Sequence, residues 1–324
     1  MRPLTPALAA ACFALVLSDQ AWAQEGATQV PPTVGGEASR EDARATASQV
    51  GRVRNSRRNQ PDRQPAPPSP EEIRATAQAL AAVAAPTCQV TEATKSSLVT
   101  AQQEAIYEAA CGSGPGYILI ASTPPQGLDC VLLAGQADIE RRADPAADVG
   151  VQCVLPANTN VTRVIAAYAK EAGVACTVDQ AASIGKSPED NLIYEVGCNG
   201  TDGYWLERVG ATWEKTSCLQ LVSQNGSCRF TTPQEQAASL KTILAGSDAA
   251  ACNVTQARYM GANANGTFYE AKCAAGDGYI ARVNAEMAVQ QVYPCAQAQR
   301  IGGGCTLTPV APATNEPAPA PATR

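Results

Sequence analysis

The chain has 324 residues, a formal net charge of −6 and a hydrophobic content of 45%. It contains no histidine, which excludes the commonest general base and every serine–histidine or cysteine–histidine nucleophile. The acidic balance is atypical of general nucleic-acid-binding proteins, which need a broad basic surface. The length allows two or three domains, and their cores must be mainly aliphatic because only 5% of the residues are aromatic.

The first 23 residues are predicted to be a secretory signal peptide. Met1-Arg2 supplies positive charge, residues 4–17 are mainly apolar, and Ala21-Trp22-Ala23 is a small-x-small cleavage site. The alternative is a lipoprotein cut before Cys12, but the segment in front of Cys12 is short and lacks the usual leucine. No later apolar run reaches the ~18 residues of a transmembrane helix. We therefore predict a periplasmic or secreted protein, with the Ala-rich composition favouring a bacterial one.

Residues 24–68 show no hydrophobic periodicity and are rich in Pro, Gly, Ser and Arg, whereas residues 309–324 are rich in Pro and Ala. These compositions predict disorder in both segments. The first segment is basic because it carries Arg52, Arg54, Arg57, Arg58 and Arg63. A solvated linker is the favoured interpretation of these arginines, and weak contact with an anionic lipid surface is the alternative.

Twelve cysteines follow the signal peptide and fall into three sets of four. In each set a Tyr lies four residues before the second Cys, and the Tyr of a Gly-Tyr pair lies six residues after it. This pattern predicts three tandem repeats, at residues 69–156, 157–231 and 232–308. The fold class is α+β, with each repeat an N-terminal helix followed by a disulfide-stapled antiparallel meander of three or four strands.

The opening helices have recognisable N-termini. Ser69-Pro70-Glu71-Glu72 and Thr232-Pro233-Gln234-Glu235 are capping boxes with Pro at the first helical position. In the middle repeat Val161, Ile165 and Tyr168 recur at helical spacing. Each helix is expected to end just before the first Cys of its repeat.

A hairpin is expected after each helix, with the first and second Cys directly opposite each other. Val90 then faces Ala109, and the same alignment holds in the other two repeats. Opposite residues at non-hydrogen-bonded sites lie ~4.5 Å apart, within reach of a disulfide. The third and fourth Cys close a second loop. The predicted bonds are Cys88–Cys111, Cys130–Cys153, Cys176–Cys198, Cys218–Cys228, Cys252–Cys273 and Cys295–Cys305.

No metal or cofactor site is expected. Export favours oxidised cysteines, and no pair has the Cys-x-x-Cys spacing of zinc sites. Asp202-Gly203 and Asp277-Gly278 lack the spacing of calcium loops and are predicted to be hairpin turns.

A glutamate occupies the same position in each repeat: Glu108, Glu195 and Glu270. In the predicted register Glu195 faces Asp179, which would suit acid–base chemistry. The favoured interpretation is a solvated strand face, because the residue opposite the glutamate differs between repeats. The preceding tyrosines are predicted to pack beside the disulfides; they are Tyr107, Tyr194 and Tyr269.

Residues that break the repeat are the candidates for partner binding. The insertion at 137–150 is predicted to be an extended surface loop carrying Arg141 and Arg142. The middle repeat alone contains Trp205, Arg208 and Trp213, and Trp and Arg are common interface anchors. Trp205 has a core role as its alternative, since isoleucine stands at its position in the other repeats.

The expected function is that of an exported, non-catalytic binding protein, such as an inhibitor or interaction module acting on an envelope or secreted protein. A structural cell-envelope component is the alternative, and an enzyme is the least favoured class. No catalytic residue is assigned.

Overall fold

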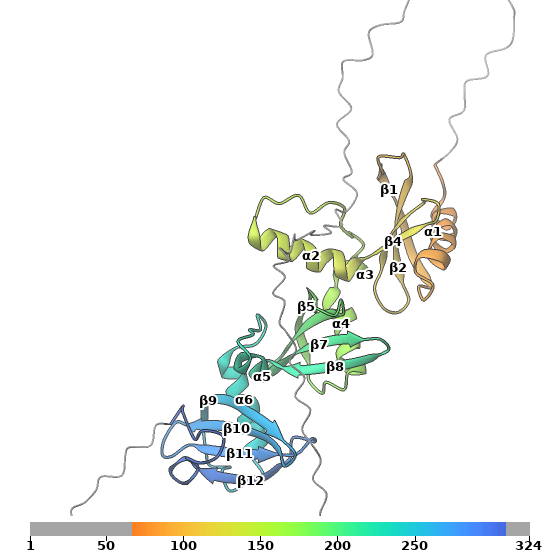
Figure 1. Ribbon diagram of the computed structural model, residues 1–324. Coiled ribbons are helices and arrows are strands. Elements are labelled where there is room, and N and C mark those ends of the chain that lie inside the picture. The colour runs from red at the N-terminus through yellow and green to blue at the C-terminus, as the bar shows by residue number, and fades with distance from the viewer. Residues whose placement is uncertain (1–66, 309–324) are drawn as a thin grey trace, which may run out of the picture.

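A computed structural model of the chain describes residues 67–308. These residues form three units in chain order, each with a helix and a four-stranded antiparallel sheet (Figure 1). The predicted signal peptide, arginine-rich arm and Pro/Ala-rich tail, like the alternative cleavage at Cys12, lie outside the described residues. Among the helices that are described, none is long and apolar enough to cross a membrane.

In each unit the strands are neighbours in the order in which they occur in the chain. Unit 1 contains α1 (Pro70–Ala84), β1 (Val90–Val99), β2 (Ala105–Cys111), β3 (Tyr117–Ile120), β4 (Gln126–Asp129), α2 (Cys130–Ala143) and α3 (Pro156–Thr159). Unit 2 contains α4 (Val161–Glu171), β5 (Val178–Lys186), β6 (Leu192–Cys198), β7 (Thr201–Val209), β8 (Thr212–Ser217) and α5 (Cys218–Ser223). Unit 3 contains α6 (Pro233–Leu244), β9 (Val254–Asn263), β10 (Gly266–Cys273), β11 (Tyr279–Val283), β12 (Val289–Pro294) and the 3₁₀ helix η1 (Cys295–Gln297).

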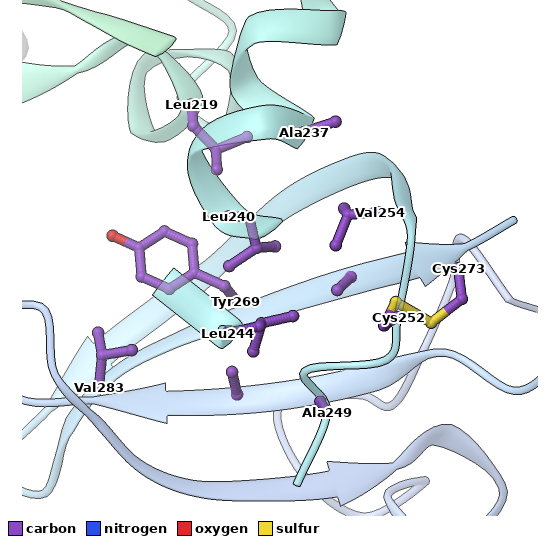
Figure 2. Close-up of a cluster of buried hydrophobic side chains, with 12 residues drawn as sticks. Leu219, Ala237, Leu240, Leu244, Ala249, Cys252, Val254, Tyr269, Cys273 and Val283 are labelled. Atoms are coloured by element: carbon purple, nitrogen blue, oxygen red, sulfur yellow. A yellow bond between two sulfur atoms is a disulfide. The ribbon is translucent and has the colours of Figure 1, made fainter. Parts of the chain in front are cut away.

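Both predicted capping boxes are present. The Ser69 hydroxyl accepts from the Glu72 N–H and the Glu72 carboxylate accepts from the Ser69 N–H, and Thr232 and Glu235 repeat this exchange. Each opening helix packs its apolar side on one face of its own sheet. Ala77 and Ala81 do so in unit 1, and Leu240 and Leu244 in unit 3 (Figure 2).

Six disulfides join the described cysteines, in the pairs that the sequence predicts. Such a density is typical of exported proteins, because oxidising compartments preserve disulfides. The first bond of each unit belongs to the core between helix and sheet. The second closes the chain after the fourth strand.

The predicted hairpin register is wrong in all three units. Val90 pairs with Cys111 rather than Ala109, and a β-bulge then shifts the pairing so that Ala93 lies opposite Ala109. Units 2 and 3 have the same bulge, after Val178 and Val254. The first Cys precedes its strand, so the disulfide does not set the register. Because the bulge adds one residue to the edge strand, the side chains that follow it point to the opposite sheet face from the one predicted.

The insertion at 137–150 is not the expected loop over its whole length. Helix α2 begins at Cys130 and continues to Ala143, so the first half of the insertion is helical. This helix lies against β5 of unit 2 (Figure 1). Gly135 is a point of close approach, since a Cβ there would lie 2.5 Å from the Ser183 carbonyl oxygen. Helix α2 is therefore the connection between units 1 and 2.

Candidate functional site

The three glutamates are buried, which corrects the prediction of a solvated face. Glu108, Glu195 and Glu270 are only 4%, 2% and 0% exposed. They lie on the sheet face away from the opening helix. The chain that follows the fourth Cys of each unit covers them, and we call it the exit segment (residues 154–158, 229–231 and 306–308).

Each glutamate accepts hydrogen bonds from its exit segment. In unit 1 the Glu108 carboxylate accepts from the N–H groups of Val154 and Leu155, at 2.9 and 2.8 Å, and from Asn158 Nδ2 at 2.9 Å. In unit 2 the Glu195 carboxylate accepts from the N–H groups of Arg229 and Phe230. The repeated glutamate thus holds the exit segment against the sheet in each of these two units.

In unit 3 the Glu270 carboxylate accepts from the Leu307 N–H at 2.6 Å and forms a 2.7 Å salt bridge with Arg258. Burial alone would raise the pKa of Glu270. Hydrogen bonds from Thr306, Arg258 and Leu307 outweigh burial and hold this pKa below its usual value. A carboxylate held ionised by such contacts is a structural acceptor.

The exit segments also explain the Gly-Tyr pairs. A Cβ on Gly203 would lie 2.3 Å from Thr231 Oγ1, and one on Gly278 would lie 2.5 Å from Thr308 Oγ1. Gly116 is approached as closely by Asn158. Only glycine leaves room for the exit segment at these three positions.

Two of the glutamates lie next to the second disulfide of their unit. A carboxylate oxygen of Glu108 and the sulfurs of Cys130 and Cys153 are all within 4.8 Å of one another, and Glu270, Cys295 and Cys305 repeat this cluster. Metal ligation by cysteine requires thiolates. The disulfides remove these sulfurs from any ligand set.

The candidate residues of unit 2 divide between the two faces of its sheet. Arg208 and Trp213 are cross-strand neighbours on β7 and β8, and the Arg208 guanidinium lies 4.7 Å from the centre of the Trp213 ring. Trp205 is on the opposite face, beside Glu195 on the adjacent strand, and is half-buried. The described residues offer its buried indole nitrogen no hydrogen-bond partner.

Trp213 belongs to an aromatic cluster at the end of α4. Its ring centre is 5.2 Å from that of Tyr168 and 5.9 Å from that of Tyr194. Its indole N–H donates to Glu171 Oε2 at 3.1 Å, and Arg208 approaches the same carboxylate at 3.8 Å. The inner side of Trp213 packs on the core of unit 2, and its outer side carries the charged pair.

The other candidate arginines, Arg141 and Arg142, are exposed in the last turn of α2. Arg142 forms a salt bridge with Asp138 at 3.4 Å. Asp138 also pairs with Arg229 of unit 2. This cluster lies where units 1 and 2 meet and is separate from Trp213.

The repeated tyrosines share the cores with the first disulfides, as expected, with Tyr194 and Tyr269 4% and 6% exposed. Asp277 lies in the connection between β10 and β11, as expected, but Asp202 does not lie in a hairpin turn. Asp202 is buried within β7, and its Oδ2 accepts from the Leu219 N–H of α5 at 3.2 Å. Asp277 accepts from the Ala296 N–H at 2.9 Å.

Sequence reasoning missed the junction between units 2 and 3. Leu219, directly after the third Cys of unit 2, inserts into the core of unit 3 beside Leu240 and Tyr269 (Figure 2). Val131 does the same in unit 2. The recurrence of an aliphatic residue after the third Cys was the available signal.

Comparison of the chain with models of protein families, with curated proteins and with solved structures found no match.

Proposed function

We propose that the protein is an exported, non-catalytic binding protein built from three copies of one module, whose partner-binding surface is the outer side of Trp213 with Arg208 and Glu171. The repeated polar groups serve the fold, because the buried glutamates hold the exit segments and all described cysteines are in disulfides. Partner binding is then assigned to the side chains that are not repeated in all three modules.

The observation that carries the proposal is the stacking of Arg208 on Trp213. The Arg208 side chain is 39% exposed and the Glu171 side chain 59% exposed, so the pair is open to solvent. An arginine held over an indole is ordered before a partner arrives, which lowers the entropic cost of binding. Gln290 stands at the position of Trp213 in unit 3, five residues before the third Cys. The proposed surface is therefore specific to unit 2.

The partner is proposed to be an exported or envelope protein of a bacterium, met in the periplasm or outside the cell. The disulfides support an oxidising compartment. The arginine pair Arg141 and Arg142 is a second, weaker candidate, because Arg142 is already paired with Asp138.

Site-specific photo-crosslinking tests the surface. A photoreactive residue at Arg208 should give one discrete adduct with an exported protein, whereas the same residue at exposed Gln290 should give none. With the partner identified, Arg208→Ala should weaken binding about tenfold or more without lowering the melting temperature. Equal adducts at both positions, or none at Arg208, would refute the proposed surface.

A further inference from the structure

Both junctions between units are built in the same way. The residue after the third Cys, Val131 or Leu219, enters the core of the following unit. Figure 2 shows Leu219 coming from α5 to meet Leu240 of α6 above the sheet of unit 3. One unit therefore supplies an aliphatic side chain and the next supplies a socket for it.

At the second junction Asp202 of unit 2 lies near the repeated tyrosine of unit 3, because it accepts a hydrogen bond from the N–H of Leu219, which packs beside Tyr269. Burial is the main cause that raises the pKa of Tyr269 to about 12, and the charge of Asp202 contributes. At the first junction the charge that acts on Tyr194 is that of Asp129, which directly precedes the third Cys and does not correspond to Asp202. Asp202 forms no ion pair within residues 67–308.

The edge strand of each unit has one residue directly opposite the repeated tyrosine. Ser183 takes this position in unit 2 and Tyr259 in unit 3. In unit 1 the residue opposite Tyr107 is Lys95, which is exposed. No unit precedes unit 1 in the described chain, and Tyr107 is only half-buried.

Unit 3 has residues at the positions that unit 2 uses to contact unit 3. Ala296 follows the third Cys, as Leu219 does in unit 2, and it is exposed. Asp277 corresponds to Asp202 and is half-buried. Neither Asp277 nor Lys95 forms a salt bridge with any described residue.

We infer that unit 3 of one chain docks on unit 1 of a second copy, in the arrangement of the junction between units 2 and 3, with Asp277 facing Lys95. The contact is head-to-tail, so it can add further copies unless the geometry closes a ring. Its charges are better matched than those of the junction between units 2 and 3, where Asp202 forms no ion pair with a described residue. Its apolar part is smaller, because Ala296 replaces Leu219, so association is weaker and depends on concentration.

This inference rests on the correspondence of the three units and is independent of the Trp213 surface. Sedimentation of the full mature chain tests it. The average mass should rise with protein concentration and fall with added salt, which screens the Lys95–Asp277 pair. Lys95→Glu or Asp277→Lys should each lower the association constant about tenfold or more, because like charges then meet. The double charge exchange should restore it.

A mixture of the two single variants gives the sharpest result. The chain with Lys95→Glu keeps an intact Asp277 end, and the chain with Asp277→Lys keeps an intact Lys95 end. Either variant alone brings like charges together at the contact, whereas both contacts between unlike chains join opposite charges. The mixture should therefore regain the association that each variant lacks by itself. Lys186→Glu, at an exposed lysine of unit 2, is the matched control and should assemble like the natural chain.

Thermal unfolding of each variant separates assembly from folding. Lys95 is exposed, so Lys95→Glu should leave the melting temperature unaltered, whereas Asp277→Lys loses the hydrogen bond from the Ala296 N–H and should melt at a slightly lower temperature while remaining folded. A monomeric mass at every concentration would overturn the inference. Association that ignores both charge reversals would overturn it as well.

Discussion

Arg258 and Glu270 face each other across β9 and β10 and form a 2.7 Å salt bridge in which the glutamate is fully buried. The same carboxylate accepts from the exit segment. Strand pairing and chain exit therefore depend on one side chain.

Glu270→Gln should lower the free energy of unfolding by about 3 kcal/mol, because it leaves Arg258 without its counter-charge. Urea denaturation of the oxidised protein measures this loss. Glu92→Gln, on the exposed part of β1, is the control and should change the midpoint little. Equal midpoints for both variants would mean that Glu270 is dispensable.

Asp202 predicts a pH dependence. Burial raises its pKa from 3.8 to about 6, against the hydrogen bonds that lower it. The folded state therefore holds this proton more tightly than the unfolded state. Its contribution to stability is full below the unfolded pKa and is lost as the pH rises through the folded pKa near 6.

Asp202→Asn should consequently stabilise the protein by about 2 kcal/mol at neutral pH and have little effect near pH 4. Melting temperatures measured between these pH values would show it. A variant that is less stable than the natural chain at neutral pH would contradict the assignment.

Gly135→Ala reverses the usual effect of this substitution. Alanine in a helix is normally favoured over glycine by about 1 kcal/mol, but here the new Cβ would lie 2.5 Å from the Ser183 carbonyl oxygen. We expect a net loss of about 1–3 kcal/mol as α2 is pushed away from β5. Gly246→Ala is the control, since nothing lies within 4 Å of that Cβ. Hydrogen exchange of β5 amides would locate the loosening, and unchanged protection there would rule out this contact.

Trp213→Ala should destabilise unit 2 by about 2 kcal/mol, because the ring packs on Tyr168 and Tyr194. Thermal unfolding checks it, with Arg208→Ala as the variant that should melt normally. A Trp213→Ala protein of natural stability would show that the ring does not support the fold.

The sequence predicted the features set by local patterns. The capping boxes at Ser69 and Thr232 begin helices, and the cysteine spacing identified the bonded pairs. Both signals lie within short stretches of chain. Four strands per unit are the upper end of the expected number.

Features that depend on distant chain could not be predicted in this way. The bulge after Val90 has no sequence mark of its own, and it reverses the two faces of the strand that follows. Glu108 is buried by residues 46 and 47 positions further on. The sequence did not predict the structure of the segment that carries Val154 and Leu155. Glu108 was therefore expected to be exposed to solvent.

The disulfides also set how the chain responds to a pull on its two ends. Each bridge keeps up to 23 residues out of the extensible path while it is oxidised. Tension would therefore act first on the segments between the bridged loops, which include the opening helices α4 and α6. Reduction would release the hidden length, so the same chain would be short and stiff outside the cell and much longer once its bonds are cut.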